Sequence, residues 1–495
     1  MTRSGRGSAS RVAALPMAAL LGVASVPLIF LFARLPAAGI GFEWSSFART
    51  LGFAVGAAAV STTVGTAIGI LTGTREFPGR RWLLCVSVAP IAAPPAFWWI
   101  GAARLTPSLG SMSGPVSGAV VGGLALSPVV LLLVVAALRQ LPSNLYDAAR
   151  VALPPAVRRR AVLLRLLYPA ILGGFVLTVI LLLGESEIPF LFGFRTVMTD
   201  VVTMFSQTFD ARQTVPLVIP LVLAIFLLGS LAARSLMSTI MVSSRGNHGV
   251  VRRRASSVVM LCAALPCVAL ALSIGGYVWA IAAARPVEWP RVPMDLSTVA
   301  ISVVEPVACA WMALGLTLLA AYPARRSRVM PYFLWIGLLL FCIPSAIYAI
   351  GWLSVGQLLG GLAVPAIVAH TSRAVPLASL GFFIGYSRLP TAFEDAATLV
   401  AVSPLRRAVV FVLPLIAGSL MAASALVAAL TYADRDVASL LLPPGASRLT
   451  LNLYLASANA PSSTVGGLAL LVLAGAAVTI GLAAAGPAAL WGRRA

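Results

Sequence analysis

Repeated apolar runs of about 20 residues dominate this sequence and leave it few ways to fold. A run of that length crosses the hydrocarbon core of a bilayer as a helix, which satisfies its own backbone hydrogen bonds there. No stretch alternates apolar and polar residues with the period of two that membrane β-strands require. Hydrophobic residues make up 60% of the chain and charged residues only 10%, against about 25% charged in soluble domains. We therefore expect an all-α polytopic membrane protein.

Twelve spans are predicted when the apolar runs are divided at Arg, Pro or polar clusters. They cover residues 12–33, 51–72, 82–103, 118–138, 170–190, 213–238, 256–284, 298–321, 332–354, 362–385, 415–432 and 463–486. The first run has Arg before it and small residues after it, which is typical of a signal peptide. Because many further spans follow, we expect an uncleaved first helix.

The formal charge of +21 is carried entirely by Arg, because the sequence contains no Lys. With the N-terminus inside the cell, most Arg fall in the tails and in the loops that follow even-numbered spans, and most acids fall on the other face. This asymmetry follows the positive-inside rule. It predicts that both termini are cytoplasmic, and it explains the positive charge without nucleic acid as a partner.

The absence of Lys also limits the chemistry. A phosphate-binding P-loop needs its Lys, so this chain has no ordinary ATPase site and any ATP-driven work needs a partner. The five Cys lie in apolar segments without metal-ligand spacing, and the two His have no ligand partner nearby in the sequence. We expect no catalytic residue, no metal site and no cofactor bound by this chain.

The sequence contains signs of an internal repeat. The matches with an offset of 250 positions pair Pro94, Ala96, Ile100 and Gly101 with Pro344, Ala346, Ile350 and Gly351. Pro128 and Pro376 match with an offset of 248. We predict two tandem halves of six helices each in the same orientation, related by an axis along the membrane normal.

Two polar loops recur at matching places in these halves. In the second loop, Glu394 and Asp395 come near a predicted helix start, where the helix dipole favours acids. Ser403-Pro404 then allows a second helix to begin, because Pro is tolerated in a first turn. In the two loops together, the residues predicted to contact a partner are Asp147, Ala148, Ala149, Arg158, Glu394, Asp395, Ala396, Ala397 and Arg406.

The second loop resembles the coupling loop of the permeases of bacterial ATP-binding-cassette (ABC) importers. The family pattern is Glu-Ala-Ala, three residues, Gly, nine residues, and then Ile, any residue and Leu-Pro. Asp395-Ala396-Ala397 takes the first place, Ala401 stands in the Gly place, Phe411 stands in the Ile place, and Leu413-Pro414 has the family spacing.

The first loop departs further from the pattern. It has Asp147-Ala148-Ala149, but Leu153 in the Gly place and Tyr168-Pro169 three residues late. The stretch from 184 to 191 also looks like the acidic segment that follows the loop in this family. The expected division is 1–46 as tail and first span, 47–240 as first permease domain, 241–297 as cytoplasmic linker and seventh span, and 298–495 as second permease domain.

As one fused chain of two permease domains, the protein is most similar to the ferric-iron and thiamine importer permeases. The resemblance implies a permease in the bacterial cytoplasmic (inner) membrane that forms the path for a small solute, with ferric iron ahead of thiamine or a polyamine-like solute. It also implies two copies of an ABC ATPase subunit, which bind ATP and Mg, on the cytoplasmic side. An extracytoplasmic solute-binding protein would dock on the other side.

Ionisable residues inside predicted spans are costly and mark candidate functional positions. Glu305 lies in the span 298–321, and His370 and Arg373 share one face of the span 362–385 because they are three residues apart. Two interpretations stay open. Glu305 neutralises Arg373 in a structural ion pair, or the three residues line the translocation path and contact an anionic solute.

Two other protein classes compete with this reading. A proton-coupled secondary transporter also has twelve spans in two halves, but its long cytoplasmic loop follows the sixth span, whereas the long loops here follow the fourth and tenth. A multi-span envelope enzyme would need reactive residues gathered near one face, and the sequence has only scattered acids.

Overall fold

The computed structural model describes residues 3–33, 41, 43–80, 83–84, 87, 113–140, 151–152, 154, 164–242, 253–254, 295–327, 329–360, 364–387, 389–399, 403–443, 445–459 and 462–491. The predicted span 256–284 and nearly all of the span 82–103 lie outside these residues, so the structure does not test them. The statements below concern the described part of the chain.

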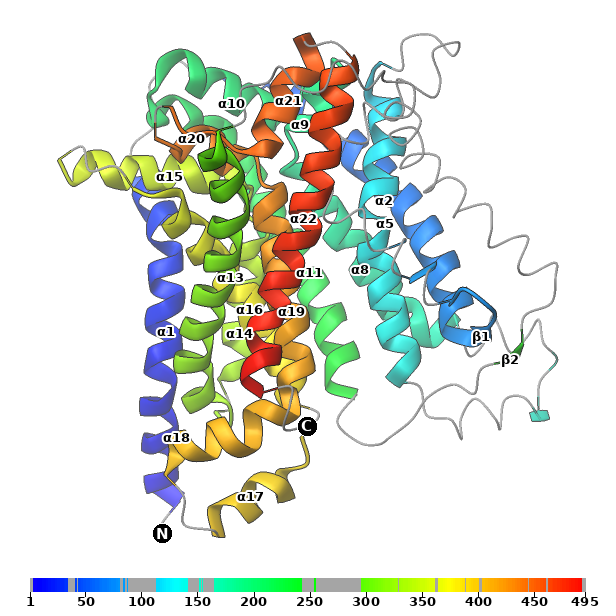
Figure 1. Cartoon of the computed structure of the whole chain (residues 1–495), viewed down its shortest axis with the longest axis vertical. Helices are drawn as coiled ribbons and strands as arrows, with labels where there is room; N and C mark the ends of the chain where they lie inside the picture. The colour runs from blue at the N-terminus through cyan, green and yellow to red at the C-terminus, as the bar shows by residue number, and fades with distance from the viewer. Residues whose placement is uncertain are drawn as a thin grey trace.

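The described residues are almost entirely helical (Figure 1). The helices before residue 250 are α1 Arg3–Ala33, α2 Trp44–Thr74, α5 Pro115–Gln140, α8 Arg165–Leu183, α9 Glu187–Leu191, α10 Val197–Thr208 and α11 Ala211–Val242. Those after it are α13 Leu296–Ala324, α14 Met330–Phe341, α15 Ser345–Leu358, α16 Ala366–Tyr386, α17 Thr391–Leu399, α18 Pro404–Arg407, the π-helix η6 Ala408–Val412, α19 Leu413–Ala433, α20 Asp436–Leu441, α21 Leu449–Asn459 and α22 Ser462–Trp491. Two-residue strands, β1 Arg75–Glu76 and β2 Arg253–Arg254, pair in parallel.

Nine helical segments in the described part are long and apolar enough to cross a membrane. They lie in α1, α2, α5, α8, α11, α13, α16, the α18–α19 segment and α22. The expected all-α polytopic character is confirmed by these helices. The finer prediction of twelve spans is not tested, because two of the predicted runs lie outside the described residues.

The predicted span over 332–354 is not one continuous helix in the structure. Helices α14 and α15 are bent by 92° at the break between Phe341 and Ser345. Pro344 occupies the N-cap position of α15 and has no backbone N–H to continue the ladder of α14. A Cβ on Gly184 would lie 2.7 Å from Pro344, so the break packs directly against the end of α8.

The helices recur along the chain. Six helices have a counterpart about 250 positions later, in the same order. The pairs are α2 and α13, α5 and α16, α8 and α19, α9 and α20, α10 and α21, and α11 and α22. The matching helices run in the same direction between the two ends of the bundle (Figure 1).

One hydrogen-bond pattern occurs in both copies. Thr50 Oγ1 donates to Ser46 O at 2.6 Å and accepts the N–H of Val197 at 2.9 Å. In the second copy, Ser302 Oγ donates to Thr298 O at 2.6 Å and accepts the N–H of Leu449 at 2.9 Å. Both of the longer-range bonds span 147 positions. This correspondence aligns α2 with α13 and α10 with α21.

The copies differ in how their first two helices pack. In the first copy, small residues bring α2 and α5 into backbone contact, since a Cβ on Gly65 would lie 2.5 Å from Ser127 O and one on Gly123 would lie 2.4 Å from Ala57 O. In the second copy, Thr317 stands in the place of Gly65, and its hydroxyl instead donates to Val375 O at 3.4 Å. The first copy is therefore held by close apolar contact at places where the second copy uses polar contacts.

The two ends of the bundle differ in charge. Helices α17 and α18 lie at the end where α1 begins and α22 ends, and α9, α10, α20 and α21 lie at the opposite end (Figure 1). The α17 end carries Arg75, Arg80, Arg165, Arg325, Arg326, Arg406 and Arg407. Most described acids are at the opposite end, among them Glu43, Glu185, Glu187, Asp200, Asp210, Asp295, Asp434 and Asp436.

Candidate functional site

The residues predicted to form the two coupling loops are only partly described. Asp147, Ala148, Ala149 and Arg158 of the first loop lie outside the described residues. In the second loop, the stretch from Glu394 to Ala397 is helical within α17. The structure therefore gives a geometry for the second loop alone.

Helices α17 and α18 form a short helical segment outside the bundle (Figure 1). Ser403 Oγ accepts the backbone N–H of Arg406, and Pro404 opens the first turn of α18, as predicted. Asp395 pairs with Arg326 at 2.9 Å, which ties α17 to the turn between α13 and α14. The side chains of Phe393 and Leu399 are exposed, so α17 presents an apolar surface beside a carboxylate.

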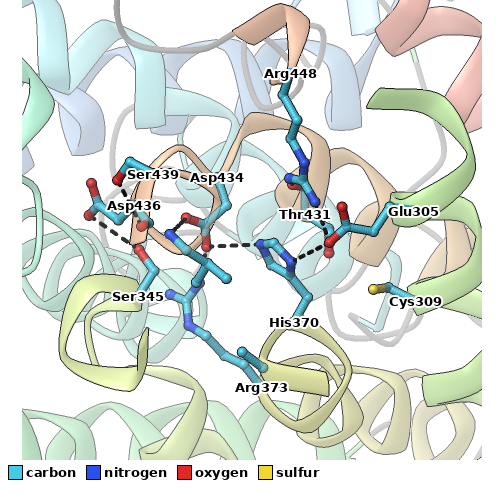
Figure 2. Close-up of polar contacts among 12 residues, drawn as sticks. Glu305, Cys309, Ser345, His370, Arg373, Thr431, Asp434, Asp436, Ser439 and Arg448 are labelled. Carbon is cyan, nitrogen blue, oxygen red and sulfur yellow. Dashed lines mark hydrogen bonds and ion pairs between the residues drawn. The ribbon is translucent and has the colours of Figure 1, made fainter. Parts of the chain in front are cut away.

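The second group of predicted residues lies inside the bundle, near the end opposite α17 (Figure 2). His370 Nδ1 lies 3.2 Å from Glu305 Oε1, which brings α16 against α13. Arg373 NH1 lies 3.1 Å from Asp434 Oδ2, just after the end of α19. The expected pairing of Glu305 with Arg373 is therefore wrong: each has another partner among the described residues.

Arg448 completes this group and was not predicted. Its side chain is 1% exposed, its NH2 lies 2.5 Å from Glu305 Oε1, and its NH1 donates to Thr431 O at 3.2 Å. The five side chains form a chain of contacts in the order Arg448, Glu305, His370, Asp434 and Arg373, which we call the ion-pair chain (Figure 2). Two guanidinium groups balance two carboxylates in it.

A half-open pocket adjoins one end of the ion-pair chain, with about 280 Å³ of unoccupied space that includes open solvent at its mouth. Its polar lining comes from His370, Arg373, Thr431 and Asp434. Its apolar lining comes from Phe341, Ala374, Leu377, Val427 and Leu430. The pocket lies between α14, α16 and α19, close to the bend that packs on Gly184.

Glu305, Cys309 and His370 each place one possible metal-ligand atom within 4.8 Å of the others. Sequence spacing gave no sign of this group, because its members come from two helices. The guanidinium of Arg448 lies against the same Glu305 oxygen that faces His370, and this positive charge opposes a metal cation there. We interpret Glu305 and His370 as members of the ion-pair chain and do not interpret them, together with Cys309, as a metal centre.

A second polar cluster joins the two copies. Ser186 Oγ donates to Asp436 Oδ1 at 3.2 Å although the two residues are 250 positions apart. Arg435 NH2 donates to Ser186 Oγ at 3.1 Å and pairs with Asp436 Oδ1 at 3.0 Å. Burial alone would lower the pKa of Arg435, but the nearby acidic groups, Asp436 first and then Glu187, together raise it. The segment between α8 and α9 thus contacts the segment between α19 and α20, about 250 positions later in the chain.

Glu185 lies beside this cluster and is expected to make stability depend on pH. Burial, and then the charge of Asp436, raises its pKa above the ordinary 4.5, although backbone N–H groups of Glu187 and Ile188 act in the other direction. A raised folded-state pKa stabilises the fold below the unfolded pKa, and this contribution is lost as pH rises through the folded value. Glu185→Gln should therefore flatten the fall of the unfolding midpoint above pH 4.5.

The measurement is detergent-solubilised unfolding followed by tryptophan fluorescence across a pH series. The exposed Glu43 at the same end provides the matched control, and Glu43→Gln should leave the profile of the original protein unchanged. An unchanged slope in Glu185→Gln would contradict the assignment.

Comparison of this chain with protein-family models, with curated proteins and with solved structures finds no match. Function is therefore argued from the sequence and the geometry.

Proposed function

We propose that this protein is the membrane-spanning permease of a binding-protein-dependent ABC importer, built from two tandem permease domains. The observation that carries the proposal is the α17–α18 segment, which lies outside the bundle between α16 and α19 and exposes Phe393 and Asp395. A short helix of this kind can insert into a groove of another protein and transmit rigid-body motion. The segment follows α16, the fourth membrane-spanning helix of the proposed second half. A long cytoplasmic loop at this place, and not midway along the chain, favours a coupling loop.

The recurrence of helices supports two halves in the same orientation. Six described helices have counterparts, and α1 and the α14–α15 pair would have theirs in residues 256–284 and 82–103. Four of the six described helices, α2, α5, α8 and α11, are long enough to cross a membrane, so with these two included each half would have six membrane-spanning helices. Contact between Ser186 and Asp436 supports an axis that runs along the bundle between the halves.

The charge distribution supports an orientation. The Arg-rich end with α17 would face the cytoplasm of a bacterial cell, and the acidic end with α10 and α21 would face outward. Two copies of an ATPase subunit, which bind ATP and Mg, would then dock on α17 and on the loop that contains Asp147. An extracytoplasmic binding protein would deliver a small solute to the other end.

In this proposal the chain makes or breaks no covalent bond. ATP binding would close the ATPase pair, the coupling segments would move with it, and the halves would rock about the contact at Ser186. The resemblance favours ferric iron as solute, with thiamine or a polyamine-like compound next. Transport that persists in cells lacking every candidate ATPase subunit would contradict the importer and favour a proton-coupled secondary transporter.

Asp395→Arg should weaken association with the cognate ATPase subunit by about 10-fold or more, since reversing a charge at an interface costs several kcal/mol. The exposed pair of Asp395 with Arg326 contributes only about 0.2–1 kcal/mol to stability, so the fold should survive. Binding of the purified permease to the subunit, and the ATPase activity of the complex, are the measurements.

Arg326→Gln is the matched control, because it removes the same ion pair without changing α17. An equal loss in Arg326→Gln would mean that the ion pair itself is what matters, which would contradict docking through Asp395. Asp147→Arg should have a smaller effect than Asp395→Arg, because the first loop departs further from the family pattern.

A further inference from the structure

The ion-pair chain occurs in the second copy only. Glu305 follows Ser302 by three residues, as Phe53 follows Thr50 in the first copy. His370 precedes Pro376 by six residues, as Gly122 precedes Pro128. Phe53 and Gly122 are in contact, since a Cβ on Gly122 would lie 3.7 Å from the Phe53 ring. The same place in the fold thus holds an apolar contact in one copy and a Glu–His contact in the other.

The two arginines of the ion-pair chain differ in the same way. Arg448 directly precedes Leu449, and its counterpart before Val197 is Thr196. Arg373 is three residues before Pro376, and the residue at that distance from Pro128 is Ala125. The fold of the first copy does without these charges. Because buried ionisable groups in a membrane bundle are costly, their presence in one copy needs a reason other than folding.

His370 presents an unused nitrogen to the pocket. Its side chain is 2% exposed, and its Nδ1 must donate to Glu305, because a carboxylate only accepts. In the neutral ring, Nε2 is then an acceptor, and no described group donates to it. Asp434 Oδ2, another acceptor, lies 3.9 Å away across the gap, too far for a hydrogen bond. Two acceptors facing each other call for a donor between them, such as a ligand ammonium group.

Arg373 needs a hydrogen-bond acceptor, whereas His370 Nε2 needs a donor. Its NH1 binds Asp434, but its Nε is buried with no hydrogen-bond partner among the described residues. Its guanidinium lies 5.4 Å from the ring centre of Phe341, which helps to hold it in place. A ligand carboxylate could accept from Nε. The Asp434 and Arg373 groups are 3.1 Å apart, and an α-amino acid carries its ammonium and carboxylate on one carbon atom, so both could be met together.

Charge balance also favours a ligand without net charge. The ion-pair chain already pairs two guanidinium groups with two carboxylates. A simple cation or anion would leave an uncompensated charge in a poorly solvated place, whereas a zwitterion would not. The rest of the pocket is apolar, with Leu377, Val427, Leu430 and the Phe341 ring facing it.

We propose that the pocket between α14, α16 and α19 binds a small amino acid with an apolar side chain, its ammonium between His370 Nε2 and Asp434 and its carboxylate on Arg373. As a solute site this rests on the proposed permease function, which it deepens by naming the substrate class. It places a zwitterion ahead of ferric iron, because Arg373 already pairs with Asp434, the carboxylate that lines the pocket.

The test uses the two histidines of the sequence. In a His248→Gln chain, His370 is the only histidine, so ¹⁵N-histidine labelling in nanodiscs reports its two nitrogens alone. Without ligand, the spectrum should show a neutral ring with the proton on Nδ1. Saturating L-leucine should shift the Nε2 signal upfield as this nitrogen accepts a hydrogen bond. Isocaproate, which lacks the ammonium, and isoamylamine, which lacks the carboxylate, should shift it at least 10-fold more weakly at equal concentration.

Variants separate binding from folding. Asp434→Asn and Leu377→Trp, which fills the pocket, should each abolish the leucine shift, while Asp200→Asn at the same end should retain it. A permanently protonated ring with no response to leucine would overturn the proposal in favour of a closed ion-pair network. A shift by isocaproate equal to that by leucine would overturn it in favour of an anion site. Because no ATPase subunit is present, failure here leaves the coupling prediction for Asp395 standing.

Discussion

Arg448→Met is expected to lower the free energy of unfolding by about 3–5 kcal/mol, the cost of leaving a buried charge without its partner. The Arg448 side chain is fully enclosed, and its NH2 lies against Glu305 Oε1. Removing it leaves the Glu305 carboxylate facing only His370, and also leaves Thr431 O without the donor it has now. Equilibrium unfolding in mixed micelles, followed by circular dichroism, measures the loss.

A double variant separates this charge effect from the loss of side-chain volume. Glu305→Gln combined with Arg448→Met removes both charges, so it should recover most of the stability that Arg448→Met loses. The exposed Arg212 at the same end of the bundle supplies the control, and Arg212→Met should change stability by less than about 0.5 kcal/mol. If the double variant is as unstable as Arg448→Met alone, packing and not charge explains the effect.

The fold could be predicted from the sequence where it depends on the length and polarity of single segments. The predicted spans 51–72 and 298–321 fall within α2 and α13, because an apolar run of that length has few alternatives to a membrane helix. The bend before Ser345 could not be predicted in this way. Pro344 looks no different in sequence from Pro376, which lies inside the continuous helix α16, and only contact with the end of α8 separates them.

Part of the candidate site could also be predicted from single segments, and the rest depended on packing. Glu305, His370 and Arg373 stand out because they are ionisable residues within apolar runs. Their partner Asp434 lies just outside the run 415–432, and Arg448 lies midway between that run and the run 463–486, where charged residues are ordinary in a sequence. Pairing them requires knowing that α13, α16 and the end of α19 meet, which is a property of packing. The repeat itself offered one usable signal, since Glu305, His370, Arg373 and Arg448 stand where the first copy has Phe53, Gly122, Ala125 and Thr196.

Arg435→Met should also lower the free energy of unfolding by about 3–5 kcal/mol, because it leaves Asp436 unpaired where the two copies meet. Arg435 NH2 contacts both Asp436 Oδ1 and Ser186 Oγ, and its guanidinium lies 4.2 Å from the ring centre of Tyr454. Asp436 would keep only hydroxyl donors, from Ser186 and from Ser345. The same equilibrium unfolding experiment measures this loss.

Single-atom changes around Arg435 test whether the contact between copies is responsible. Ser186→Ala should cost only about 1 kcal/mol, the net value of an ordinary hydrogen bond, because the pair of Arg435 with Asp436 remains. Asp436→Asn added to Arg435→Met should restore most of the stability, since no buried charge is then left alone. The exposed Arg195, which pairs with Asp200 at the same end, is the matched control. If Arg195→Met is as costly as Arg435→Met, the burial of Arg435 beside Ser186 does not explain the loss.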